Sequence, residues 1–498
     1  MMDIIGLLLG LLLLWAFGIA CLQALPSRMN RWTAAGGTTW MIGAGGMAGL
    51  FLATLWLRVL SLAGIRFSVV AITLPLLLAT LALGGWAIYR SGIRGTLMAS
   101  VREALGELSG RTLEGTGRIL WRLLLAWLIL RYAMLFSEVT TRPLFPWDAW
   151  TQWATKGRVW YELGRIVPFE RADAWFAAGG SAYFDAGPHY PGTVGLIQVL
   201  SSNFLGRWDD TLMNLPFWML SVAFVVAIFG ALRAMEFSPL SALAGTWLIA
   251  SLPLANTHVA LAGYADLPLA MYFCAGILAC LRWHKSREPG DAVLAVLLLA
   301  ACPLLKIPGR IWALLALPAL IVAWLPTRGP RIVAIGYAVA VFAFLLLAQT
   351  SPVIMGYHLH LDFSADWEAL ANSFLLYDNW HLLWYGTIAV ALLGRRELLK
   401  PQVAPLTAVV VGGVIFLAFV LLFTNARDWV SDQSTVNRAT LHMAPVVVVW
   451  MLVVFRAWAR TLPTALPAPP VPMSLPAQGV IEPLSSLPAT TPPPLIAP

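Results

Sequence analysis

The chain has 498 residues, of which 59% are hydrophobic and 11% are charged, whereas roughly a quarter of the residues are charged in a soluble domain. This composition excludes a soluble enzyme and indicates an integral membrane protein. The formal charge of +8 does not indicate nucleic-acid binding, because the basic residues recur in short loops between apolar runs rather than along one exposed face.

Apolar runs recur from the start of the chain almost to its end. One span needs about 20 apolar residues to cross a hydrocarbon core of roughly 30 Å. Hydropathy predicts thirteen spans, at residues 4–25, 39–60, 68–88, 118–137, 212–232, 239–257, 264–283, 291–305, 310–326, 331–350, 375–394, 404–424 and 440–457. The expected fold is therefore an all-α polytopic membrane protein of about 13 transmembrane helices, with a large outer loop that carries interfacial amphipathic helices.

The positions of Lys and Arg predict the orientation of the chain. If the short apolar stretch 191–205 stays on the outer side, eleven basic residues beyond position 212 lie inside and four lie outside. That excess agrees with the positive-inside rule. We therefore expect the N-terminus outside and the C-terminus in the cytoplasm, with the protein in a bacterial inner membrane.

The order of the expected spans and the composition of the C-terminal region divide the chain into three parts. Residues 1–117 are expected to form accessory helices and a cytoplasmic loop, and residues 118–457 the main transmembrane domain. Residues 458–498 are expected to be a disordered cytoplasmic tail, because this region is rich in Pro, Ser, Thr and Ala. The first apolar run lacks a basic region before it and a small-residue cleavage site after it, so we interpret it as a retained span.

The first candidate site residue is Asp148, which lies among tryptophans in the longest polar stretch between expected spans. If residues 147–163 are helical, Trp150, Trp153 and Trp160 share one face and Asp148 lies opposite. Such a helix would lie in the membrane interface. The alternative is an aromatic belt, in which Asp148 is an ordinary helix cap.

Three further charged residues are expected at outer ends of spans. An acid such as Asp266 is costly there unless it faces a polar cavity or a cation; the alternative is helix capping. Lys306 and Arg438 are cations on the side that the positive-inside rule depletes, and their alternative is snorkelling toward lipid phosphate. His258 precedes Asp266 in the sequence. Its two alternative roles are a substrate contact and a hydrogen-bonded loop residue.

The other motifs in the sequence indicate function less specifically. The alternating His358, His360 and Asp362 would suit a metal if the segment were extended, against the alternative of a solvated or acceptor-binding loop. Four cysteines lie in or beside apolar runs without the spacing of a metal or redox site. The sequence has no Gly-rich phosphate loop and no Gly-x-Ser-x-Gly elbow, which disfavours a nucleotide-driven pump.

The order of these motifs resembles the GT-C glycosyltransferases, the polytopic group that includes protein O-mannosyltransferases and the lipid A aminoarabinose transferase. The similarity covers roughly residues 118–457. The motifs that carry it are an acid beside Trp in a large outer loop and then, in chain order, His189-Tyr190-Pro191, Tyr264-Ala265-Asp266, Lys306-Ile307-Pro308-Gly309 and a late Arg438. The acidic loop follows the fourth expected span rather than the first, and Trp147-Asp148 replaces the adjacent acidic pair of the family.

The resemblance implies transfer of a sugar from a polyprenyl-phosphate carrier to a lipid, glycan or protein acceptor on the outer face. Asp148 is then the catalytic base for the acceptor hydroxyl. Lys306 and Arg438 bind the donor phosphate, and Asp266 orients a substrate or holds a divalent metal ion with Asp148. The expected substrate contacts are Trp147, Trp150, His189, Tyr190, Tyr264 and His258.

Two rival classes of protein remain open. A secondary transporter or lipid flippase predicts inverted repeats with broken helices near the midplane, whereas the polar residues here gather at one expected face. A membrane scaffold does not explain acids and bases on the same side. If the enzyme hypothesis is right, both aspartates and both cations converge.

Overall fold

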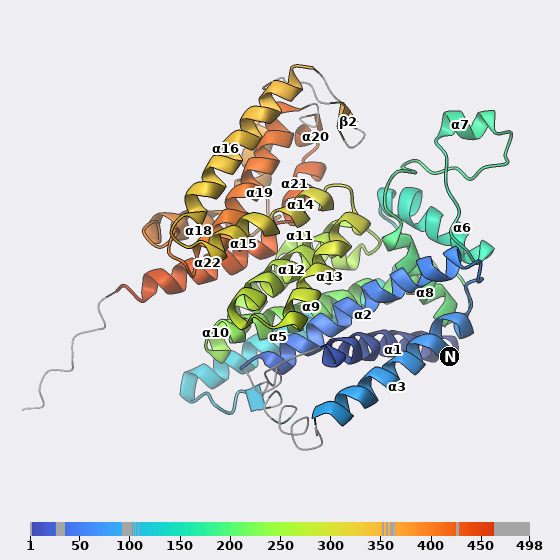
Figure 1. Ribbon diagram of the computed structural model, residues 1–498, viewed down its shortest axis with the longest axis horizontal. Coiled ribbons are helices and arrows are strands. Elements are labelled where there is room, and N and C mark those ends of the chain that lie inside the picture. The colour runs from blue at the N-terminus through green and yellow to red at the C-terminus, as the bar shows by residue number, and fades with distance from the viewer. Residues whose placement is uncertain are drawn as a thin grey trace, which may run out of the picture. The chain divides into compact units, whose positions relative to one another are not determined.

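Nearly all the regular structure in the computed structural model is helical (Figure 1). The structure describes residues 2–25, 35–91, 109–350, 365–424 and 428–462, together with residues 102, 104, 106, 107, 353, 354, 357, 358 and 363. The first half of the chain forms α1 (Met2–Ala24), α2 (Gly37–Leu62), α3 (Val69–Ser91), α5 (Gly115–Thr141), the π-helix η1 (Ala149–Ala154), α6 (Thr155–Leu163), α7 (Ala172–Ala177), α8 (Thr193–Leu205), the 3-10 helix η2 (Leu212–Asn214), α9 (Leu215–Ala234) and α10 (Pro239–Ala250).

The second half continues with α11 (Pro253–Ala260), α12 (Asp266–Ser286), α13 (Pro289–Leu305), α14 (Gly309–Leu314), α15 (Ala316–Trp324), α16 (Gly329–Ala348), α17 (Trp367–Ala371), the π-helix η3 (Asn372–Leu376), α18 (Leu383–Leu393), α19 (Ala404–Phe423), α20 (Asp428–Ser431), α21 (Ser434–Leu441) and α22 (Ala444–Ala459). In the described residues the strands are β1 (Val353–Ile354) and β2 (Tyr357–His358), which pair antiparallel.

Eight helices in the described part of the chain are long and apolar enough to cross a membrane. They are α1, α2, α3, α5, α9 with η2, α12, α16 and α19. The bent pair of α21 and α22 makes a ninth if it forms one span. The protein is thus an α-helical membrane protein.

Helices also occupy the other four expected spans, but these helices are short or interrupted. The stretch 239–257 is divided into α10 and α11, because Pro253 restricts the preceding residue to an extended ψ of 123°. The helix α13 has 17 residues and α18 has 11, and 310–326 is divided between α14 and α15. Eleven residues cover only about 16 Å, so the structure does not confirm thirteen spans.

The ambiguous stretch 191–205 forms α8, whose 13 residues are all buried. At 1.5 Å per residue, it extends about 20 Å, which is shorter than a hydrocarbon core. It packs against α1, α2, α3 and α6, and its polar side chains, such as Gln198 and Ser201, are buried with its apolar ones. This geometry agrees with a stretch that does not cross.

The helix α2 packs against α1 on one side and α9 on the other (Figure 1). Small residues make this close packing possible, because apolar helices in lipid associate where their backbones approach. A Cβ added at Gly49 would overlap the Leu14 carbonyl of α1, and one at Gly43 would overlap the backbone of Ala227 in α9. Larger residues at these two positions would therefore separate the helices.

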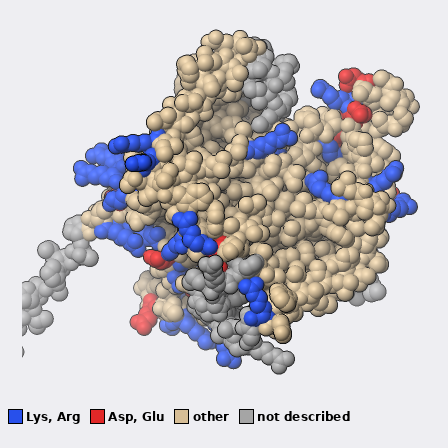
Figure 2. All heavy atoms as spheres, in the orientation of Figure 1, with Lys and Arg blue, Asp and Glu red and all other residues tan. Residues whose placement is uncertain are grey.

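The candidate spans differ in how much of their surface the protein covers. In α2, α9 and α12, 78% of the apolar window is buried, against 11% in α3, 17% in α5 and 6% in α16. Apolar helices as exposed as the last three need a lipid environment. Figure 2 agrees, since wide areas of the face that it shows carry no charged side chain.

Residues Met1–Trp458 form one compact unit and Ala459–Pro498 a second. The expected accessory helices within residues 1–117 belong to the first unit, since α1 and α2 pack against α8 and α9. Almost all of the expected disordered tail lies outside the described residues.

Candidate active site

Four charged side chains from distant parts of the sequence meet around Arg438. One Arg438 nitrogen, Nη2, lies 2.7 Å from Asp148 Oδ2 and 3.0 Å from Asp266 Oδ2. The Lys306 ammonium donates to Asp266 Oδ1 at 2.6 Å. The structure therefore brings together the two aspartates and two cations that the sequence analysis singled out. We call this group, with His442, the charge cluster.

The local fold explains this convergence. Asp266 is the first residue of α12, and Arg438 lies on α21, which packs against α12. Lys306 follows α13 in extended backbone (φ −152°, ψ 150°), two residues before Pro308. Asp148 precedes η1. Each charge therefore stands at a helix end or on a short helix.

Gly263 brings the start of η1 close to the start of α12. Its φ of 103° is unfavourable for residues with a side chain. A Cβ there would lie 3.0 Å from the Leu144 side chain and 3.2 Å from Ala149. Because Ala149 follows Asp148 and Gly263 precedes Tyr264, this contact sets the spacing of the two aspartates.

Sequence reasoning missed His442, the fifth member of the charge cluster. Its Nε2 lies 3.0 Å from Asp266 Oδ1, and Trp312 Nε1 donates to its Nδ1 at 3.1 Å. Because an indole N–H only donates, Nδ1 must be the unprotonated acceptor, and Nε2–H donates to Asp266. His442 follows Arg438 by four residues, the spacing that places two side chains on one helix face, and that spacing was the available signal.

The side chains of the charge cluster differ in solvent exposure, and their charges cancel. The Asp266 side chain is fully buried, those of Lys306 and Arg438 are 14% and 17% exposed, and that of Asp148 is 28% exposed. Two carboxylates and two cations sum to zero when His442 is neutral. Such balance is what a buried ionic group requires, since an unpaired buried charge is strongly destabilising. Asp148 is thus the acid that solvent or substrate can reach.

The structure decides between the alternatives for these residues. Neither Asp148 nor Asp266 forms a side-chain cap to its own helix; both pair with Arg438. Lys306 and Arg438 do not snorkel toward lipid, since their charged groups bind Asp266 inside the protein. Helix capping and snorkelling are therefore not the roles that these residues have.

Two expected substrate contacts border the charge cluster. The Arg438 guanidinium carbon lies 4.3 Å from the centre of the Tyr264 ring, a cation–π contact. The Tyr264 ring is 5.4 Å from that of His258. His258 is buried, and its Nδ1 lies 2.9 Å from the Leu254 carbonyl, as in the hydrogen-bonded alternative.

The tryptophans depart from the expected pattern. Trp153 and Trp160 are buried in the protein, whereas Trp150 is 45% exposed. The predicted common face is wrong because residues 149–154 form a π-helix, whose i to i+5 bonding alters the angular spacing of an α-helix. Trp150 instead forms an edge-to-face pair with Trp147, which is 68% exposed, at a centroid distance of 4.9 Å.

His189 and Tyr190 belong to a different group of residues. Their rings stack at 4.9 Å, and Tyr190 packs against Trp153 at 5.1 Å. Beside them Lys156 forms a buried ion pair with Asp185 at 3.3 Å. Burial raises the pKa of Asp185 and lowers that of Lys156, and each partner opposes the shift of the other. This ion pair joins α6 to the loop before α8. The sequence analysis did not predict it.

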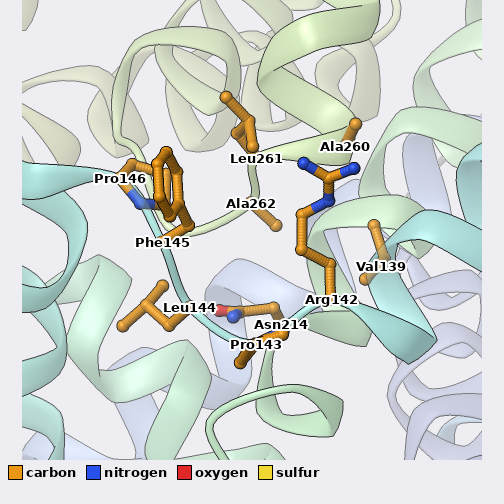
Figure 3. A pocket seen from close by; sticks show the side chains of 10 residues that line it. All are labelled: Val139, Arg142, Pro143, Leu144, Phe145, Pro146, Asn214, Ala260, Leu261 and Ala262. Atoms are coloured by element: carbon orange, nitrogen blue, oxygen red, sulfur yellow. The ribbon is translucent and has the colours of Figure 1, made fainter.

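A small hollow lies beside the segment that leads to Asp148 (Figure 3). Arg142 and Phe145 flank the 260–262 backbone that leads to Tyr264. Arg142 pairs with Glu138 at 2.8 Å. Both walls of the hollow therefore belong to segments that lead in the sequence to residues of the charge cluster: one wall leads to Asp148 and the other to Asp266.

Asp148 and Asp266 do not suit a shared divalent metal ion. The Arg438 guanidinium lies between them and contacts both. The oxygen Oδ1 of Asp266 is bound by Lys306 and His442, and Oδ2 by Arg438. The described residues contain no group of three potential metal ligands. His360 and Asp362 lie outside the described residues, as does the His358 side chain.

His258 predicts a pH dependence of stability. Burial lowers its pKa to about 4, and Asp266 opposes that shift. Between pH 6.5 and pH 4 the unfolded chain binds a proton at His258 that the folded protein does not, so stability falls as the pH is lowered through this window. Thermal unfolding at several pH values should show a weaker loss in His258→Gln. If stability falls with pH as steeply in His258→Gln as in the exposed control His381→Gln, this role of His258 is excluded.

The fold and the charge cluster define an α-helical membrane protein with a buried ionic network at its helix ends. Comparison of the chain with protein-family models, curated proteins and solved structures found no match.

Proposed function

We propose that this protein is a membrane glycosyltransferase that moves a sugar from a polyprenyl-phosphate donor to an acceptor on the outer face. The observation that carries the proposal is the position of Arg438 between a partly exposed aspartate and a buried one. Displacement at a sugar phosphate uses a base for the incoming hydroxyl and a cation for the leaving phosphate, and Asp148 and Arg438 are candidates for these two roles.

The proposed reaction is a single displacement. The acceptor hydroxyl oxygen forms a bond to the anomeric carbon while the bond from that carbon to the donor phosphate oxygen breaks. Asp148 receives the hydroxyl proton, and the lipid phosphate leaves with the electron pair. Attack from the face opposite to the leaving group inverts the anomeric centre, as the resemblance implies.

Arg438 couples the two ends of this reaction. Before the reaction, it is bound by two carboxylates, so its positive charge is largely neutralised. When Asp148 takes up the proton, one of these negative charges disappears. The field of Arg438 at the phosphate then becomes more positive as the leaving group gains charge, which is the stabilisation that lowers such a barrier. Lys306 supplies a second cation.

The remaining members position these groups. Asp266 binds Lys306, Arg438 and His442, so it orients cations rather than touching the sugar. Exposed Trp147 and Trp150 offer faces on which a sugar ring or a lipid chain can stack. No step is assigned to a metal ion, because Arg438 takes up the space between the carboxylates. His189 and Tyr190 remain proposed substrate contacts.

Charge at the opposite helix ends supports the proposed sidedness. Lys285 in the last turn of α12 pairs with Glu236 after α9, and Arg456 of α22 bonds the Met235 carbonyl. These cations lie at the ends of α9, α12 and α22 remote from Asp266, as the positive-inside rule expects of a cytoplasmic face. We propose an outer charge cluster, an N-terminus outside, thirteen crossings and a bacterial inner membrane.

A direct assay tests the function. The purified protein is incubated with polyprenyl-phosphate sugars labelled in the sugar, together with lipid, glycan and protein acceptors. The expected result is label covalently attached to one acceptor class, with release of polyprenyl phosphate. Movement of intact labelled donor across a vesicle bilayer, without any covalent product, would instead identify a transporter or flippase.

A further inference from the structure

A second group of cations lies where α2 ends, away from the charge cluster in the sequence. A cleft of about 460 Å³ is lined by Ser61, Gly64, Arg66, Leu163, Arg165 and Ile166. It lies between the turn that joins α2 to α3 and the C-terminal end of α6. The proposed transfer reaction uses none of these residues.

Backbone contacts hold the two walls of this cleft together. Phe67 N–H donates to the Gly164 carbonyl at 2.7 Å, and Ile166 N–H donates to Ser61 Oγ at 3.0 Å. The Arg66 side chain lies over Gly164, because a Cβ added there would be 3.4 Å from both Arg66 Cβ and Nε. Arg66 therefore lies beside the residue that precedes Arg165, and the two arginines share one cleft.

The simplest explanation of these arginines is that they complement helix dipoles. Both α2 and α6 end at the cleft, and each C-terminus carries roughly −0.5 of an elementary charge. Two guanidinium groups contribute +2, so roughly +1 remains after both dipoles are offset. No ion pair of the described residues involves Arg66, Arg165 or the nearby Glu162. Because Glu162 does not line the cleft, the cleft lining itself retains an excess of positive charge.

A third arginine adds to this field. Arg58 lies one turn before Ser61 on α2, and its Nη2 donates to the hydroxyl of Thr193 at 2.9 Å rather than to an acid. Its buried Nε has no hydrogen-bond partner in the described part of the chain. Arg58 thus adds a third guanidinium group, from the last turns of α2.

The surroundings of the cleft identify the kind of anion. Leu62 is 89% exposed and Ile65 is 48% exposed, and α3, which begins at Val69, is the poorly covered apolar helix described above. Apolar side chains beside unpaired arginines at the end of a span match the boundary between acyl chains and phosphate groups. Arginine binds phosphate oxygens in a bidentate way.

We propose that this cleft binds the phosphate group of an anionic lipid. The two arginines hold the phosphate, and Leu62 and Ile65 contact the acyl chains. The site does not depend on the glycosyltransferase hypothesis, because none of its residues belongs to the charge cluster.

Equilibrium binding of radiolabelled dioctanoyl phosphatidylglycerol to the full-length purified protein tests the proposal. Saturable binding is expected for the wild type, and at least about tenfold weaker binding for the double variant Arg66→Gln with Arg165→Gln, since the variant loses the charge-assisted hydrogen bonds to the phosphate. The control double variant, Arg158→Gln with Arg171→Gln, removes the same net charge from exposed arginines outside the cleft and should bind like the wild type.

Three results would overturn the proposal. Unchanged binding in the cleft variant excludes the site, and equal weakening in both variants shows only general electrostatic attraction. Inorganic phosphate that competes as strongly as the labelled lipid would show a free-phosphate site rather than a lipid site. Gel filtration of each variant, with the monodisperse profile of the wild type, establishes that these residues affect binding and not folding.

Discussion

Asp148→Asn is expected to lower sugar transfer by roughly 10²–10⁴-fold, the range for loss of a general base. The amide can still accept a hydrogen bond from Arg438, but it cannot take up the proton of an acceptor hydroxyl. The substitution also removes the change in charge that would strengthen the field of Arg438 during the reaction. Initial rates at saturating donor should show the loss in kcat, with a smaller change in KM.

The same variant is expected to insert and fold. Asp148 is the most exposed member of the charge cluster, and Arg438 retains Asp266 as a buried partner. Asp173→Asn is the matched control, because Asp173 is an exposed acid in the same long segment between α5 and α9. Turnover near the wild-type rate in Asp148→Asn would remove Asp148 from the mechanism.

Asp266→Asn is expected to have the largest effect on stability. It leaves the Lys306 ammonium without its anionic partner and removes one of the two carboxylates that bind Arg438. Breaking a buried ion pair from one side costs about 3–5 kcal/mol, because a buried charge remains uncompensated. The midpoint of thermal unfolding in a fixed detergent should fall markedly, and transfer should be lost with it.

A second substitution separates this cause from a general packing defect. In the double variant Asp266→Asn with Lys306→Met, the unpaired ammonium is gone, so part of the lost stability should return. Lys306→Met alone provides the third corner of the cycle. If the double variant is as unstable as the sum of the single variants, Asp266 and Lys306 are not energetically coupled.

Hydropathy placed its spans correctly on helical segments, because each expected span coincides with one or more helices. It overestimated their lengths where proline interrupts the backbone, as at Pro253 in 239–257. A window average does not register a missing N–H or a restricted preceding residue. The interruption before α14 also places Lys306 where it reaches Asp266.

The tryptophan pattern shows a different limit. An ideal α-helix from 147 to 163 places Trp150 with Trp153 and Trp160, but the π-helix at its start separates Trp150 from the other two. Nothing in the local sequence marks that insertion, because a π-helix is stabilised by its tertiary surroundings and is rare in isolation. The aromatic residues near Asp148 were correctly identified, but their orientations were not.

The sequence alone determined that this is a helical membrane protein, and it singled out two acids and two cations as candidate site residues. Burial cost and the positive-inside rule make those residues conspicuous in an apolar chain. Only the tertiary structure decided their pairing: Asp266 binds Lys306, Arg438 and His442, and Asp148 binds Arg438 at the exposed side. The reason is physical, because ion pairs depend on distances of a few ångströms between residues as far apart in the chain as Asp148 and Arg438, and no local pattern specifies those distances.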